Sequence, residues 1–139
     1  MERKFMKKIL ISLILVSLGA SVASAQNADG KSEEEKMYEF VQEQVEALSS
    51  LLELDAAQEF YVDSILTHDF GEMQAEINAM NKSKVLNSDL YVQVQDKWRE
   101  KMYVAFEKIL APEQWEKYLK SGALRDKKGR DKRAAKAGK

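Results

Sequence analysis

The chain has 139 residues, with 22 basic and 23 acidic side chains, a formal net charge of −1, no cysteine and one proline. This length provides one small domain, and the missing cysteine excludes disulfides, thiol catalysis and a lipid-modified N-terminus. The single proline and the long helical periodicity argue against an all-β domain, and no Gly-rich phosphate loop or stacked repeat is present.

The first 25 residues have the three parts of a secretory signal peptide. A basic start precedes an apolar run over 9–18, and small residues stand before Gln26, so cleavage is expected between Ala25 and Gln26. The alternative is a membrane anchor, but this run is shorter than the roughly 20 residues that a spanning helix needs. We therefore expect an exported, periplasmic protein that begins with a flexible leader over 26–31.

The charge of the remaining chain is divided unevenly. Residues 26–80 carry two basic residues against fourteen acidic ones, a net charge of −12. Residues 81–139 carry sixteen basic residues against eight acidic ones, a net charge of +8. We expect part of this complementarity to be internal, with an acidic helix lying near a basic one within one chain or between chains.

The first helix is predicted over residues 32–52. Ser32 at the N-cap and Glu35 three residues later are typical of a capping box. Apolar residues recur at helical spacing, at Met37, Val41, Val45, Leu48 and Leu52. The opposite side carries an acidic stripe of Glu35, Glu39, Glu43 and Glu46. This stripe is interpreted as a solvated face, with a docking face for a basic helix as the alternative.

Three further helices complete the predicted helical domain, which spans 32–122. They are expected over 56–80, 90–110 and 112–120. Gly71 inside the second helix costs about 1 kcal/mol relative to alanine, so the sequence allows a bend or a break near Phe70 and Gly71. Gly122 is placed to end the last helix.

The segment 123–139 is predicted to be a disordered basic tail. It has almost no large apolar residue to bury and a strong excess of lysine and arginine. The sequence therefore favours an all-α fold: a helical hairpin or thin bundle of about four helices, followed by this tail.

Two short segments share a leucine, a helix-starting position and a glutamine. The residues concerned are Leu54, Asp55 and Gln58 in the first segment and Leu110, Pro112 and Gln114 in the second. Asp55 and Gln58 form the Asp-x-x-Gln version of a capping box. In the second segment Pro112 stands at the first helical position, while Ala111 has no side-chain acceptor. Both segments are predicted to start helices at sharp corners, which requires no chemistry of the glutamines.

This doubled motif resembles that of the Spy/CpxP-like family of periplasmic proteins, in which Leu-Thr-x-x-Gln is written twice. Leu54 with Gln58 and Leu110 with Gln114 match the first and last motif positions. The threonines are replaced here by Asp55 and Ala111, and the likeness extends over about 33–122. The resemblance implies a helical protein that often dimerises into a thin curved cradle. It also implies an ATP-independent chaperone or an envelope-stress adaptor, and some members bind metal ions.

The residues themselves provide little for catalysis or metal binding. His68 is the only histidine, and Glu72 one turn later, with Asp69 and Glu76 nearby, would make a weak metal site at most. An exposed histidine on an acidic helix face is the preferred interpretation. No catalytic triad or paired-carboxylate signature is recognisable. We therefore expect no enzyme activity, no cofactor and no bound metal.

The middle helices carry more apolar surface than one narrow stripe requires. The residues selected as a dimer or client surface are Phe60, Tyr61, Phe70, Met73, Tyr91, Trp98, Met102 and Tyr103. A homodimer interface is the favoured interpretation, and a face that holds unfolded chains is the other.

Two functions follow from these observations. The first is an exported, ATP-independent chaperone-like or stress-response adaptor protein that binds unfolded chains or an envelope partner. The alternative is a protein that binds an anionic envelope surface through its basic tail and has no chaperone activity. No nucleic-acid partner is expected.

Overall fold

The structure is a computed structural model, and it describes residues 30–138. The predicted signal peptide, its cleavage site at Ala25 and Gln26, and most of the leader lie outside the described residues. Within 30–138 every regular element is helical, which confirms the expected all-α class. In the same range, no helix combines the length and the apolar character needed to span a bilayer.

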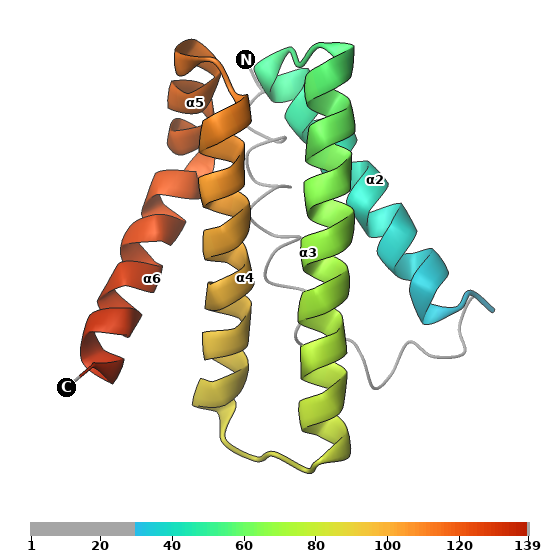
Figure 1. The fold of residues 1–139 in the computed structure, drawn as a ribbon, viewed down its shortest axis with the longest axis vertical. Helices are drawn as coiled ribbons and strands as arrows, with labels where there is room; N and C mark the ends of the chain where they lie inside the picture. The colour runs from blue at the N-terminus through green and yellow to red at the C-terminus, as the bar shows by residue number, and fades with distance from the viewer. Residues whose placement is uncertain (1–29, 139) are drawn as a thin grey trace.

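The described chain forms α-helices joined by short connections. They are α2 (Glu33–Leu52), α3 (Ala56–Lys82), α4 (Ser88–Ile109), α5 (Pro112–Tyr118) and α6 (Leu124–Ala137), with a π-helical turn η1 (Leu119–Ala123) between the last two. Figure 1 shows α3 and α4 as an antiparallel pair, with α2 crossing behind α3 and α6 descending beside α4. The bounds of the first four helices agree with the predicted ones to within two residues.

Side-chain caps explain why the helices begin where they do. The Ser32 hydroxyl accepts a hydrogen bond from the Glu35 backbone N–H at 3.2 Å at the start of α2. At the start of α4, the Asn87 side chain accepts from the Asp89 backbone N–H at 2.9 Å. Each cap satisfies a backbone donor that has no partner within its helix.

One apolar core lies where α2, α3 and α4 meet. Its buried residues are Val41, Val45, Leu48, Leu52, Val62, Leu66, Phe70, Met73, Trp98, Met102, Phe106 and Leu110. Phe40 of α2 contacts Phe70 of α3 edge to face, with ring centroids 5.1 Å apart. The apolar side chains of α2 recur at helical spacing and therefore share one face. Because α2 crosses α3, this face helps to enclose the core.

Half of the predicted dimer or client surface is interior, and this part of the prediction is wrong. Phe70, Met73, Trp98 and Met102 are at most 7% exposed. The prediction placed Phe70 off the main apolar face of its helix. The crossing α2 places Phe40 against Phe70 on that side of α3, and Trp98 of α4 packs against His68 of α3, so these side chains supply packing and not surface.

The predicted disordered tail is also corrected, because residues 124–137 form α6. Its basic side chains pair with two acidic residues of α4. Lys127 and Arg130 both contact the Glu100 carboxylate, at 2.6 and 3.1 Å, and Arg133 contacts Asp96 at 2.6 Å. Composition alone predicted disorder because it does not show these partners.

Gly71 and Gly122 have different roles in the helical chain. α3 continues through Gly71 as one helix, without the break that the sequence allowed. Gly122 has a φ of 124° inside η1, a conformation that L side chains rarely adopt. The kink at Gly122 separates α5 from α6, so the predicted helix end at this glycine becomes a change of direction.

We expect Gly71→Ala to stabilise the protein. A methyl group at this position would meet no heavy atom within 4 Å, leaving aside the backbone of its own helix. Alanine also loses less backbone entropy than glycine on entering a helix. The free energy of unfolding, measured by urea denaturation, should rise by about 0.5–1 kcal/mol.

Gly122→Ala is the matched comparison, because the space around Gly122 is equally open. Its positive φ should make alanine destabilising by about 1–3 kcal/mol. Shifts of the same sign in both variants would contradict the assignment of Gly122 as the kink.

Candidate functional site

The first Leu-x-x-x-Gln segment forms the corner between α2 and α3. The Gln58 backbone N–H donates to the Asp55 carboxylate at 2.8 Å, and the Asp55 backbone N–H donates to Gln58 Oε1 at 3.1 Å. Both halves of the predicted capping box are therefore present. Leu54 lies against the core beside this corner.

The second segment forms the corner between α4 and α5 and has half of a capping box. The Ala111 backbone N–H donates to Gln114 Oε1 at 2.9 Å. Alanine has no acceptor to complete the other half, as predicted, and Pro112 stands at the first helical position. Leu110 is buried in the core.

The two corners are joined by their glutamines, which we call the glutamine clasp (Gln58 and Gln114). Gln58 Nε2 donates to Gln114 Oε1 at 2.7 Å, and Gln114 Nε2 donates to Gln58 Oε1 at 3.0 Å. The side chains are half-buried between the corners. A reciprocal amide pair of this kind fixes both the distance and the orientation of the two corners.

Each amide nitrogen of the clasp also bonds a carbonyl at the end of a helix. Gln58 Nε2 donates to the Ile109 carbonyl of α4 at 3.2 Å. Gln114 Nε2 donates to the Leu52 carbonyl of α2 at 3.1 Å. Together with the cap bonds, both donors and both lone pairs of each amide have partners. The clasp therefore satisfies orphan backbone groups at the ends of two helices and the starts of two others.

Sequence analysis identified the clasp residues but missed their contact. The glutamines are 56 residues apart, and helix-start patterns report only local bonds. The only sequence signal was the repetition itself: two corners with the same geometry place their glutamines in equivalent positions.

The remaining residues of the predicted surface have distinct positions. Phe60 and Tyr61 are 68% and 53% exposed, and their rings meet edge to face. The half-buried Tyr91 donates its hydroxyl hydrogen toward Asn81 Oδ1 and the Val85 carbonyl, both at 2.9 Å, which holds the α3–α4 connection. Tyr103 is half-buried with its ring 4.9 Å from that of Trp115. Of the residues predicted for this surface, Phe60 and Tyr61 therefore carry the exposed aromatic rings; Tyr38 of α2, which was not among them, is 64% exposed.

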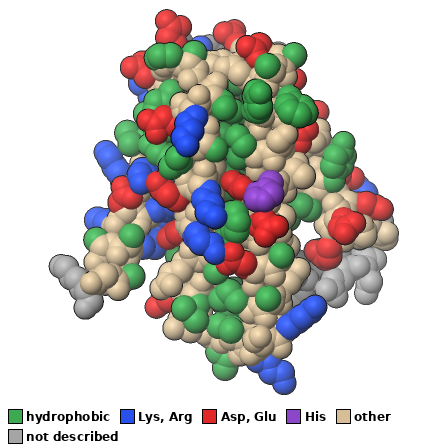
Figure 2. Space-filling model, viewed as in Figure 1, with side chains coloured by type: hydrophobic (Ala, Val, Ile, Leu, Met, Phe, Trp, Pro, Cys, Tyr) green, Lys and Arg blue, Asp and Glu red, His purple; other side chains and the backbone are tan. Residues whose placement is uncertain are grey.

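A shallow groove of about 440 Å³ lies between Ile65 of α3 and the side chains of α4. Figure 2 shows hydrophobic, basic and acidic side chains mixed over the face of the molecule on which α3 and α4 lie in front. The lining of the groove combines apolar side chains, including Ile65, Val104 and Ile109, with the basic Lys101 and Lys108 and the acidic Glu100 of α4. Val104 is 41% exposed. This groove is the apolar surface that the crossing helix α2 leaves uncovered.

A cluster of polar side chains also links α3 and α4, at Glu76 on α3 and at Lys97 and Trp98 on α4. Lys97 Nζ and Trp98 Nε1 both donate to Glu76 Oε1, at 2.5 and 2.9 Å. The bond from Lys97 holds the pKa of the Glu76 carboxyl below its usual value, and the bond from Trp98 acts in the same direction. Glu76 is therefore a structural anion, and not a proton donor near neutral pH.

His68 is exposed and contacts Asp69, with Nδ1 2.8 Å from the carboxylate. Across residues 30–138, no group of three or more His, Asp or Glu side chains is arranged as metal ligands. Among the described residues, His68 and Asp69 are therefore two neighbouring side chains that could bind a metal, without a third beside them.

Comparison of the chain with protein-family models, with characterised proteins and with solved structures finds no match. The resemblance to the Spy/CpxP-like family therefore rests on the doubled motif and remains a prediction.

The clasp predicts a coupled loss of stability. Gln58→Ala and Gln114→Ala should each lower the free energy of unfolding by about 2 kcal/mol, because each removes a cap and leaves the partner amide unsatisfied. The double variant should cost clearly less than the sum of the two single changes. Urea denaturation of the four proteins measures this coupling.

The Gln58→Glu variant distinguishes the contribution of the glutamine clasp to stability from that of the helix cap. A carboxylate still accepts from the Asp55 backbone N–H but cannot donate to Gln114 or Ile109, so we expect a loss as large as that of alanine. Gln74→Ala, which removes an exposed bond to Asn78, is the control and should stay within about 0.5 kcal/mol. An unchanged free energy of unfolding in Gln58→Glu would show that the clasp contributes little to stability.

Proposed function

We propose that this protein is an exported, ATP-independent holding protein that binds apolar segments of unfolded chains on the α3–α4 face. The observation that carries the proposal is the groove lined by Ile65, Val104 and Ile109, which is open at the surface, with Ile65 and Ile109 also packed against the core. Exposed apolar surface of this kind is typical of a site for another chain.

The composition of the groove and its surroundings supports loose, general binding. Tyr61 lies one turn before Ile65 on α3 and is exposed, and its ring contacts that of Phe60, so aromatic side chains are available near the groove. Lys101 and Lys108 place positive charge along the other side. A groove that is shallow and mixed in this way favours extended segments with apolar and acidic residues over one specific small ligand.

Suppression of aggregation tests this function. The purified protein should reduce light scattering from reduced insulin, and the effect should change little between about 50 and 300 mM salt, because apolar contacts are weakly screened. Val104→Gln should remove at least about half of the suppression by placing an amide in the groove.

Val92→Gln is the matched control for Val104→Gln. Val92 is on the same helix and is 37% exposed, but it lies outside the groove, on the side toward α6. It should leave suppression unchanged. Equal effects of the two variants, or no suppression by the parent protein, would refute the proposed site.

A second function is favoured by one feature of α6. Arg125, Lys128, Lys132 and Lys136 recur at steps of three and four and are all exposed. Their acidic neighbours on α4 are already paired with Lys127, Arg130 and Arg133. Such a solvent-facing basic stripe fits an anionic envelope surface.

Binding to vesicles that contain phosphatidylglycerol tests the stripe. Lys132→Gln should weaken binding about five-fold, the expected effect of one charge near an anionic surface. Lys127→Gln changes charge equally on the side of α6 that faces Glu100, and should weaken binding less than two-fold. Binding that persists at about 300 mM salt would argue against this function.

A further inference from the structure

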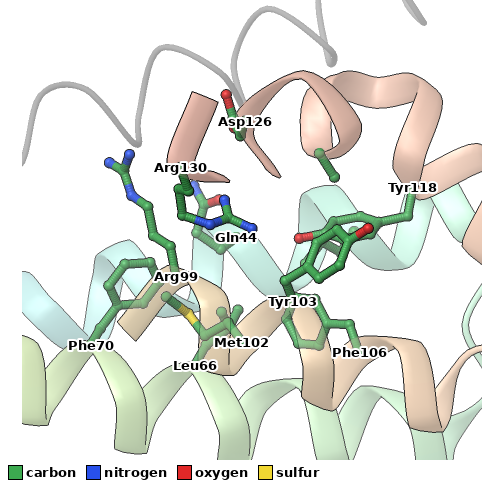
Figure 3. Close-up of a pocket in the computed structure, with 12 residues that line it drawn as sticks. Gln44, Leu66, Phe70, Arg99, Met102, Tyr103, Phe106, Tyr118, Asp126 and Arg130 are labelled. Atoms are coloured by element: carbon green, nitrogen blue, oxygen red, sulfur yellow. The ribbon is translucent and has the colours of Figure 1, made fainter. Parts of the chain in front are cut away.

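A small cavity of about 50 Å³ lies where α6 covers the core. Its lining includes Gln44 from α2, Leu66 from α3, Met102 from α4 and Arg130 from α6. In Figure 3 the Gln44 and Arg130 side chains end in the same region, beside the rings of Tyr103 and Tyr118. Five helices therefore contribute to one cavity.

Two buried donors in this cavity have no partner. Gln44 is 4% exposed and Arg130 is 7% exposed. Gln44 Nε2 and Arg130 Nη2 are buried without a hydrogen-bond partner among protein atoms, whereas Arg130 Nε is bonded to Glu100. A buried donor without a partner is costly, and a charged one more so, which points to an acceptor that occupies the space.

The unpartnered Nη2 of Arg130 favours an anionic acceptor, and the same guanidinium is paired with Glu100 through Nε. Arg99 also lines the cavity; burial lowers the pKa of its guanidinium, while the charges of Asp126 and Asp96 act in the opposite direction. Its guanidinium points away from the ends of Gln44 and Arg130 in Figure 3. Burial likewise raises the pKa of the Tyr118 phenol, which keeps that hydroxyl protonated. Asp126 is the acidic residue of the lining, and its carboxylate points away from Gln44 and Arg130 in Figure 3.

The rest of the wall is apolar, and the volume limits the ligand. Leu48, Leu66 and Met102 face the cavity and cannot bond water. The space would hold roughly three to five water molecules at about 10–15 Å³ each. A molecule with a similar number of non-hydrogen atoms, charged at one end and apolar at the other, matches both parts of the wall.

We propose that this cavity binds a short-chain monocarboxylate, such as acetate or propionate. The carboxylate oxygens accept hydrogen bonds from Gln44 Nε2 and Arg130 Nη2, and the alkyl group lies against Leu66 and Met102. Charge-assisted bonds from a guanidinium favour a carboxylate over a neutral carbonyl. So few ligand atoms give a dissociation constant in the millimolar range.

A titration of the purified protein with sodium propionate, followed by NMR on the Gln44 side-chain amide and the Arg130 Nε–H, tests the site. At constant sodium concentration, both signals should shift and saturate below about 50 mM. Propionamide, which has the same size without the charge, should bind at least ten-fold more weakly. Equal shifts from the two compounds, or no saturable shift, would overturn the proposal and leave water as the occupant.

Two variants and a control locate the bonds. Gln44→Leu should weaken propionate binding about ten-fold and leave the fold intact, since it removes an unpaired buried amide. Arg130→Gln should weaken binding at least as much. Arg133→Gln removes the same charge one turn away, at a side chain paired with Asp96 and outside the cavity, and should change binding less than two-fold. Unchanged affinity in Gln44→Leu, or equal losses in Arg130→Gln and Arg133→Gln, would contradict the proposal.

Discussion

The reciprocal amide pair of Gln58 and Gln114 is the constraint on which the architecture depends. It joins the ends of α2 and α4 to the starts of α3 and α5, through side-chain and backbone bonds at one end of the antiparallel pair. Because both corners are fixed to each other, α2 and α5 must leave the α3–α4 pair at set angles (Figure 1). The rest of the domain, including the course of α6 after η1, is built outward from this point.

The direction of α2 decides which apolar side chains become core and which remain surface. α2 packs on α3, so Phe70 is buried there against Phe40, while Val104 of α4 stays exposed. α2 and α6 cover parts of the α3–α4 pair and leave the groove at Val104 open. The open groove is therefore a consequence of the same helix arrangement that forms the core, and it is the surface for which a binding role is proposed.

Local chemistry made the helix bounds predictable, whereas long-range contacts were not. Asp55 and Pro112 mark helix starts through bonds within a few residues, so the sequence located these corners closely. The clasp was missed because its partners are 56 residues apart. The burial of Phe70 depends on where α2 crosses, and the order of residues 124–137 depends on Glu100 and Asp96 of another helix. Each error arose from a contact that local composition does not encode.

The glutamine clasp and the contact between α6 and α4 depend on different kinds of interaction. The clasp consists of neutral amides, whose bonds change little with salt or with pH near neutrality. α6 has seven basic residues against two acidic ones and is held on α4 by ion pairs, of which only Arg130 is deeply buried. Exposed ion pairs are weak and are screened by salt. The two corners joined by the clasp are therefore insensitive to salt. The packing of α6 on α4 responds to salt, and so does the cavity that Arg130 of α6 helps to close.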